Sequence, residues 1–415
     1  MHRLTNTQSR SLLHAGGLHT AGDRGKNAAL AAPTQQTTTI PEGGTMRRIK
    51  SKAVVLAVIL ATAGALAACG DDSDSEDTAT ADTTEVAEEA ATEDTTAAEE
   101  ATPTEAAGPD LSALSGKTIG IISLAPGLEP VDRLQAGVVE CAEANGGSTQ
   151  VFDAKGGTEA VQAFEQANNA GVDAIYNVAN DIGNGSLDAA LKTAGDAGRP
   201  VVTVWGGQRT GSYSITGLEF QSAARVGQYV IDRIAAESGG IAAGDVLIVN
   251  ARVTPSLRQR ADALKAMTGE GSEYPDIKVT EVEVDLANAV ADAQAKVEQA
   301  FQANPDIKAV YASFDSLGQG AAAAVDGLDT KAFVVSFNGD SSALDLIRAG
   351  KSFAATAAND LEGTASLGCE LLAKLIAGEK PEATTYWMDS PLVTNKNVPA
   401  SGFATGPGSF TLYNP

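Results

Sequence analysis

The chain has 415 residues and a strong acidic excess, with 29 Lys and Arg against 53 Asp and Glu and a formal net charge of −24. This balance argues against binding to nucleic acid, which requires Lys and Arg to displace counterions from phosphates. All three His lie at positions 2, 14 and 19, and only three Cys are present. Residues 111–415 therefore lack a Ser-His-Asp triad, a Cys-His nucleophile and a His-based metal site, so we expect no enzyme, no cofactor and no metal.

Residues 46–69 have the organisation of an export signal. An uncharged apolar run, 53–66, is too short to span a bilayer but suits the core of a signal peptide. The basic residues that precede it are Arg47, Arg48, Lys50 and Lys52. The LAAC ending at Leu66–Cys69 resembles the lipobox of bacterial lipoproteins, which implies cleavage before Cys69 and lipidation of its sulfur. An ordinary secretory peptide with a stray Cys and a single-pass anchor are the alternatives.

The segments on either side of this signal lack the sequence patterns of folded domains. Residues 1–45 show no apolar periodicity, and because a complete signal begins at Met46 we interpret them as a non-native upstream extension. Residues 69–110 begin with the Cys expected to be lipidated, and from residue 70 on they contain mainly Asp, Glu, Thr, Ala and Ser. Such a composition does not bury enough apolar surface to offset the entropy of ordering, and its charges repel one another. We expect an acidic disordered tether between the 46–68 signal peptide and the folded body.

From residue 111 on, buried-type apolar runs alternate with segments of helical periodicity. This alternation predicts parallel sheets that are covered by helices on both faces. The predicted strands are 117–124, 149–153, 174–178, 200–204, 212–216, 245–250, 279–284, 309–312, 333–337 and 353–358. The rhythm begins again after residue 210, so we expect an α/β fold with two doubly wound lobes in series. The final segment returns to both lobes.

Polar residues follow many of these strands, where ligands bind in open parallel sheets. Two such edges that face each other would form a cleft with converging hydrogen-bonding groups. The residues at these strand ends are Asp153, Asn180, Asp181, Trp205, Asn250, Arg252, Asp315, Asn338, Asp340 and Asn359. A Gly-Asn-Gly at 183–185 lacks the third glycine of a dinucleotide loop, and we interpret it as a turn. No pair of carboxylates stands out as a glycosidase site.

Between about 117 and 393 the chain resembles the ribose-binding type of periplasmic solute-binding protein, which shares its fold with the ligand domain of lactose-repressor relatives. The matching stretches are IGIIS (119–123), LQAG (134–137), GVDAI (171–175), RPVVTV (199–204), TPSLRQRADAL (254–264), VYASFD (310–315), VVSFNG (334–339) and FAATAAND (353–360). The resemblance implies three crossovers, near Thr216, Ala358 and Trp387. It thus implies an N-terminal lobe of 111–216 plus 359–387 and a C-terminal lobe of 217–358 plus 388–415.

The resemblance also implies positions for the ligand site. The guanidinium that grips sugar hydroxyls in the family falls on Arg260, and a family aspartate is kept as Asp315. Family polar groups are replaced at Asn338, where an acid becomes an amide, and at Asn359, where a glutamine becomes an asparagine.

Two aromatic residues stand where the family has polar ones. Trp205 replaces an aspartate, and Phe314 replaces an asparagine. The stacking aromatics of the family's first loop are missing near Pro130 and Val131. Trp205 would restore stacking against the apolar face of a sugar, whereas packing beneath the hinge is the alternative. With Asp181 from the strand ends, these residues form the predicted ligand site.

These features predict a monomeric extracytoplasmic lipoprotein that is anchored to the outer face of the cytoplasmic membrane. It would close around a monosaccharide or polyol and deliver it to an ABC permease. A sensory binding protein that presents its ligand to a membrane receptor is the alternative. A repressor is disfavoured because the chain carries an export signal and no helix-turn-helix domain.

We also expect a disulfide between Cys141 and Cys369. Cys141 continues the apolar stripe of the first helix, and Cys369 lies on the stripe of the last long helix. By the resemblance both helices belong to the N-terminal lobe and lie side by side, and export permits oxidation. Two buried thiols that act as small apolar residues are the alternative.

Overall fold

The computed structural model describes residues 109–403 and 410–413. The upstream extension 1–45, the signal 46–68 and Cys69 lie outside the described residues, as does the tether 69–110 apart from its last two positions. Among the described helices none is both long enough and apolar enough to cross a membrane.

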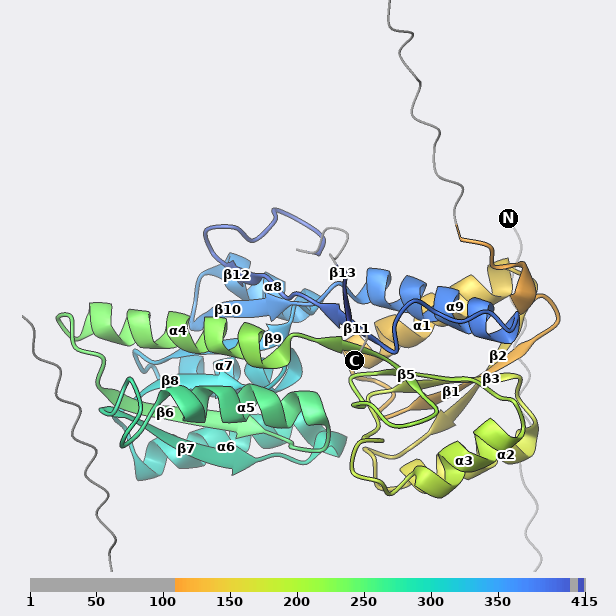
Figure 1. Ribbon diagram of the computed structural model, residues 1–415. Coiled ribbons are helices and arrows are strands. Elements are labelled where there is room, and N and C mark those ends of the chain that lie inside the picture. The colour runs from red at the N-terminus through yellow and green to blue at the C-terminus, as the bar shows by residue number, and fades with distance from the viewer. Residues whose placement is uncertain (1–108, 404–409, 414–415) are drawn as a thin grey trace, which may run out of the picture. The chain divides into compact units, whose positions relative to one another are not determined.

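Two sheets form the framework (Figure 1). The first has seven strands in the order β13-β11-β5-β4-β3-β1-β2, and the second has six in the order β12-β10-β9-β8-β6-β7. Within the sheets only the β11–β13 and β10–β12 pairs are antiparallel. The first sheet contains β1 (Thr118–Ser123), β2 (Ser148–Asp153), β3 (Ala174–Val178), β4 (Val201–Val204), β5 (Tyr213–Gly217), β11 (Thr385–Met388) and β13 (Phe410–Tyr413). The second contains β6 (Gly244–Asn250), β7 (Ile277–Glu283), β8 (Ile307–Ala312), β9 (Phe333–Asn338), β10 (Phe353–Ala358) and β12 (Leu392–Thr394).

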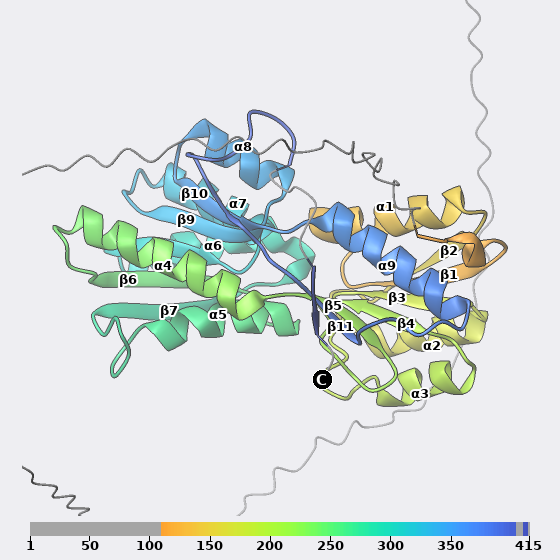
Figure 2. The ribbon, with the colours of Figure 1, turned by 45° about the horizontal axis from the view of Figure 1, so that its top comes forward.

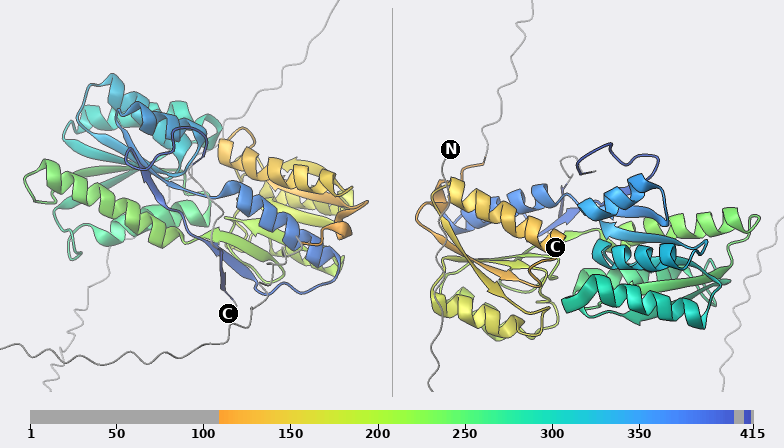
Figure 3. Two further views of the ribbon diagram at one scale, coloured as in Figure 1. Left: turned by 90° about the horizontal axis from the view of Figure 1, so that it is seen from above. Right: turned by 180° about the vertical axis from the view of Figure 1, so that it is seen from behind.

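Helices cover both faces of each sheet (Figures 1 and 3), which confirms the prediction of two doubly wound α/β lobes. The first lobe carries α1 (Glu129–Ala144), α2 (Ala160–Ala170), α3 (Asp188–Asp196) and α9 (Leu361–Ile376). The second carries α4 (Glu219–Glu237), α5 (Pro255–Met267), α6 (Ala289–Ala303), α7 (Asp315–Gly327) and α8 (Ser341–Ala349). Short 3-10 turns lie at η1 (Ser112–Leu114) and η2 (Leu286–Asn288).

The helices form where apolar side chains recur at helical spacing. In α1 the apolar residues Val131, Leu134, Val138 and Ala142 recur at helical spacing, and all four are buried. The helix begins after Leu128 with a proline in its first turn, where the missing N–H has no intrahelical partner to lose. Burial of this stripe against the sheet fixes the start of α1 at the edge where the strands β1 and β3 end.

The chain passes between the lobes at three connections that lie together between the sheets (Figure 2). These are β5 to α4 at 217–219, β10 to α9 at 358–361, and β11 to β12 at 388–392. They fall within a few residues of the predicted crossovers.

The last strand corrects one expectation. We assigned 388–415 to the C-terminal lobe, but β13 pairs with β11 in the first sheet. The free edge of β11 accepts a further antiparallel strand, and its backbone groups are satisfied by that pairing.

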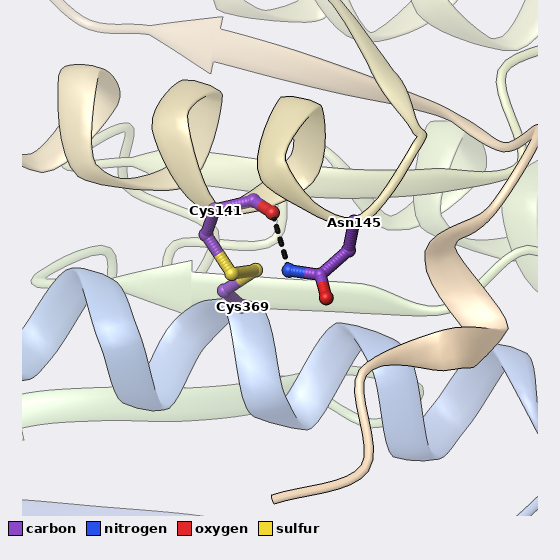
Figure 4. The surroundings of a disulfide bond; sticks show 3 residues. All are labelled: Cys141, Asn145 and Cys369. Carbon is purple, nitrogen blue, oxygen red and sulfur yellow. Dashed lines mark hydrogen bonds between the residues drawn. A yellow bond between two sulfur atoms is a disulfide. The ribbon is translucent and has the colours of Figure 1, made fainter.

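The predicted disulfide is present. Cys141 of α1 and Cys369 of α9 are joined with their Cα atoms 6.5 Å apart, although 228 positions separate them in sequence (Figure 4). The bond links the first helix of the lobe to the last, which returns to this lobe after the second crossover. Asn145 donates from Nδ2 to the Cys141 carbonyl at 2.8 Å and caps the same end of α1.

Candidate functional site

A small cavity lies between the two lobes, at the carboxyl ends of strands from both sheets. Its volume is about 40 Å³, room for about one water molecule. Six lining residues come from the first lobe and seven from the second. They are Leu124, Leu128, Pro130, Val131, Ala179 and Trp205, and then Thr254, Ser256, Leu257, Arg260, Leu286, Phe314 and Asn338.

Arg260 of α5 is the charged residue of this cavity, and nearly all of its hydrogen-bonding capacity is already used. Its Nε and Nη2 donate to the two carboxylate oxygens of Glu219, at 2.6 and 3.2 Å. Its Nη1 donates to the Ser313 carbonyl at 2.9 Å and to Asn338 Oδ1 at 3.1 Å. Four of the five N–H donors of the guanidinium are thus engaged. The fork that we expected to face ligand hydroxyls instead faces Glu219.

Trp205 lines the cavity in a strained backbone conformation. It follows β4 with φ of +57°, a left-handed conformation that costs a non-glycine residue about 1–2 kcal/mol. The next residue, Gly206, packs so closely that an added Cβ would lie 2.3 Å from the Asn180 carbonyl. Trp205 is 5% exposed, and its indole N–H is buried without a hydrogen-bond partner among the described residues. Strain and an unpaired donor at one residue are typical of a functional position.

Two other cavity residues share this backbone strain. Ala179 follows β3 with φ of +65°, and Asn338 ends β9 with φ of +114°. All three strained residues therefore stand at the carboxyl ends of strands, and all three line the same cavity. Asn338 Oδ1 accepts from Arg260 and from Asn359 Nδ2, while its own Nδ2 donates to no described residue.

Asp315 and Asn359 lie behind the cavity wall and do not line it. Asp315 is fully buried at the start of α7, where it accepts hydrogen bonds from the hydroxyls of Ser336 and Thr356 and from the backbone N–H of Asp340. Burial raises the pKa of Asp315 to about 7. Asn359 holds Asn338 at 3.1 Å and accepts from the Ser390 hydroxyl at 2.6 Å. Asn359 thus contacts the cavity residue Asn338 directly, whereas Asp315 contacts the backbone of Asp340, two residues after Asn338.

Asp340 is a buried acid that the sequence placed at a strand end but not among the predicted ligand residues. Its side-chain oxygens have no partner among the described residues. Burial raises the pKa of the Asp340 carboxyl well above its usual range, and the charges of Asp315 and Glu129 raise it further.

Asp181 forms a contact between the lobes and is not part of the cavity wall. Its Oδ2 accepts from Arg258 Nη2 of α5 at 2.7 Å, while its Oδ1 accepts from the backbone N–H of Gly183. A second contact joins Glu129 of α1 to the first residue of α8: the backbone N–H and hydroxyl of Ser341 donate to the Glu129 carboxylate at 2.6 and 2.7 Å. Both contacts join the first lobe to the second across the cleft.

A wider groove adjoins the cavity. It has a volume of about 770 Å³ and lies between loops of both lobes, from β1 and β2 on one side and from β6 and β7 on the other. Leu128 and Leu286 line both spaces. These two residues, one from each lobe, lie where the groove and the cavity meet.

Of the seven predicted ligand residues, four line the cavity: Trp205, Arg260, Phe314 and Asn338. Sequence reasoning missed Thr254 and Ser256, although they lie in the matching stretch 254–264. It also missed Glu219, whose only signal was its place as an acid directly after the first crossover.

The fold and the cavity define a two-lobed α/β protein of the kind that binds a small solute between its lobes. The chain belongs to the family described as periplasmic binding protein domain, whose model matches residues 120–380. Solved structures of solute-binding proteins of transporters share the fold.

One, from Agrobacterium vitis with bound allitol, is 21% identical and has a TM-score of 0.62, covering 69% of this chain and 97% of its own. Another, from Agrobacterium radiobacter in complex with D-arabinose, is 22% identical with a TM-score of 0.59 and covers 68% and 95%. A third, from Mycobacterium smegmatis with bound glycerol, is 23% identical with a TM-score of 0.61 and covers 70% and 100%. At these identities the likeness shows the fold.

Proposed function

We propose that this protein is an extracytoplasmic solute-binding lipoprotein that captures a monosaccharide or polyol by lobe closure and delivers it to an ABC importer. The observation that carries this proposal is the cavity at the carboxyl ends of both sheets, bounded by Trp205 and by the Arg260–Asn338 pair. Membership of the family supports it. So do the ligands of the structural neighbours, which include allitol, D-arabinose and glycerol.

The electrostatics of the site favour a neutral ligand. The positive charge of Arg260 is balanced by Glu219, and both side chains are at most 3% exposed. A charged ligand would therefore enter a closed site without a counter-charge, at a large cost in desolvation.

The size of the cavity implies an opening motion. Ligand pockets usually measure about 300–1,000 Å³, so a space of about 40 Å³ has to widen before a sugar enters. We assign this motion to the three connections at 217–219, 358–361 and 388–392, with Leu128 and Leu286 parting at the mouth. Closure would then bury the ligand against Trp205.

The location follows from the leader. We propose cleavage before Cys69, a lipid on its sulfur, and a spacer role for 69–110. In this scheme the lobes consist of 111–216 plus 359–387 and of 217–358 plus 388–403, with 410–413 added to the first. Cys69→Ala should release or mislocalise the protein, as fractionation would show. Retention of that variant in the membrane as an unprocessed precursor would instead indicate an uncleaved anchor.

A thermal-shift screen of pentoses, hexoses, polyols and nucleosides tests the proposed ligand class. A ligand that binds only the native state adds about 2.7 kcal/mol to the free energy of unfolding at 100 times its Kd, which is a clear shift in Tm. Calorimetry on each hit should give one site per chain. A screen in which no sugar or polyol shifts the Tm, while the protein unfolds cooperatively, would contradict the proposal. Deletion of the gene should then abolish uptake of the radiolabelled hit.

A further inference from the structure

The two walls of the cavity differ in chemistry. The first lobe contributes Leu124, Leu128, Pro130, Val131, Ala179 and Trp205, and the indole N–H is the only polar side-chain group among them. The second lobe contributes all the other polar side chains, which are those of Thr254, Ser256, Arg260 and Asn338, together with the apolar side chains of Leu257, Leu286 and Phe314.

The backbone of the first-lobe wall supplies few of the missing donors. The N–H of Val131, in the first turn of α1, has no acceptor among the described residues, and the N–H of Leu128 donates to the Ala125 carbonyl at 3.3 Å. The N–H groups of Leu124, Ala179 and Trp205 donate to the carbonyls of Val178, Val204 and Ile215, at 3.1, 2.8 and 3.0 Å. Pro130 has no N–H at all. A hydroxyl pressed against this wall would therefore lose its hydrogen bonds to water and gain few in return.

The second-lobe wall has only a few hydrogen-bonding groups that are free to contact a ligand. Thr254 and Ser256 share a hydrogen bond of 2.7 Å between their hydroxyls, and Thr254 Oγ1 also caps α5. Arg260 keeps one N–H, and Asn338 keeps its Nδ2 group. These groups are enough for two or three hydroxyls along one edge of a ligand, and too few for hydroxyls around a whole ring.

We propose that the ligand is amphipathic: a small neutral molecule whose hydroxylated edge binds the second lobe, and whose apolar group, such as a methyl or a deoxygenated carbon, is buried against the first lobe by Trp205 and Val131. This inference rests on the proposed function and narrows its ligand class. It follows from the confinement of the cavity's polar side chains, apart from the indole N–H, to the second lobe, because closure brings the two walls against opposite sides of one ligand.

The test uses calorimetry with the tightest-binding fully hydroxylated sugar of the screen and its complete set of monodeoxy and mono-O-methyl analogues. At least one analogue should bind about tenfold or more tightly than the parent, because its parent hydroxyl would be buried unpaired at a cost of about 1–3 kcal/mol. Tightest binding by the parent, with every analogue weaker, would overturn the inference and leave the proposed function standing. If no sugar or polyol binds, both fail.

A variant of the apolar wall provides the matched control. Val131→Thr keeps the shape of the side chain and adds one hydroxyl to the first-lobe wall, so the preference for the best analogue over the parent should shrink several-fold. The ratio of the two Kd values in one preparation does not depend on the fraction of folded protein. An unchanged ratio in Val131→Thr, repeated in Trp205→Asn, whose side chain tolerates the left-handed backbone, would contradict the placement of the apolar group.

Discussion

Glu219 and Arg260 form a buried two-contact ion pair, with Nε to Oε2 at 2.6 Å and Nη2 to Oε1 at 3.2 Å. The pair joins the start of α4, directly after the first crossover, to the helix that carries the cavity arginine. Glu219 also lies at a helix N-terminus, where a negative charge is favoured. In the cavity Arg260 is therefore a fixed hydrogen-bond donor whose positive charge is balanced by Glu219, and not a free cation.

Breaking this pair should destabilise the protein. Glu219→Gln or Arg260→Met leaves a buried charge without its partner and should lower the free energy of unfolding by about 3–5 kcal/mol. Urea denaturation measures the loss. Lys192→Met is the control, because its pair with Asp196 is mostly exposed and should contribute less than about 1 kcal/mol. Losses of similar size in all three variants would show that the buried pair contributes no more to the free energy of unfolding than an exposed pair does.

The contact between Asp181 and Arg258 should contribute to ligand affinity without touching the ligand. Asp181→Asn keeps the acceptor for the Gly183 N–H but removes the charge that Arg258 pairs with across the cleft. Affinity should fall by about 1 kcal/mol, and somewhat less at high salt, because the pair is part-buried, with side chains 35% and 7% exposed, and is only partly screened. Calorimetry at low and high salt measures this, with Asp196→Asn as the control within one lobe. Wild-type affinity of Asp181→Asn at low salt would exclude a role in closure.

Asp315 should make stability depend on pH. Its pKa is raised from 3.8 to about 7, so the folded protein holds this proton more tightly than the unfolded chain does. The free energy of unfolding should therefore fall as pH rises between about 4 and 7, by up to about 1.4 kcal/mol per pH unit, with no further contribution above that window.

Asp315→Asn should lack this contribution, so its deficit relative to wild type should shrink as the pH rises through the same window. Urea denaturation of both proteins at several pH values gives the difference. A deficit that stays constant with pH would show that Asp315 is ionised throughout.

Loss of the Cys141–Cys369 bond should destabilise the chain. The bond closes a loop of 228 positions, and removal of such a constraint on the unfolded state costs about 2–5 kcal/mol. The double Cys→Ala variant should show a lower Tm that reductant no longer changes, whereas the Tm of the wild type should fall when reductant is added. A wild-type Tm unaffected by full reduction would contradict this.

The parts of the fold that the sequence predicts are those set by local patterns. Buried strands such as Ala174–Val178 and the stripe of α1 follow from periodicity. The pairing of Cys141 with Cys369 needed the additional assignment of both helices to one lobe. The strand β13 escaped prediction because Gly, Ser and Pro dominate the residues before it, and its formation depends on the open edge of β11.

The site was predictable in position but not in detail. The resemblance placed Asp315 in the ligand site, but its carboxylate accepts hydrogen bonds from Ser336 and Thr356 and does not line the cavity. Glu219 reaches Arg260 across 41 positions of sequence, and no spacing rule indicates such a pair. The confinement of the polar cavity side chains, apart from the indole N–H, to one lobe emerges only when both sheets face one cavity.

Tryptophan fluorescence tests the central claim, that the ligand binds in the cavity beside Trp205, most directly. The chain has two Trp, so in a Trp387→Phe background the emission comes from Trp205 alone. Titration with a ligand from the screen should change this emission saturably, with the Kd that calorimetry gives. Trp205→Ala should weaken binding by about 1–3 kcal/mol through lost burial and stacking. A ligand that binds with wild-type affinity to Trp205→Ala, and leaves the emission of Trp205 unchanged, would contradict the claim and place the binding site elsewhere.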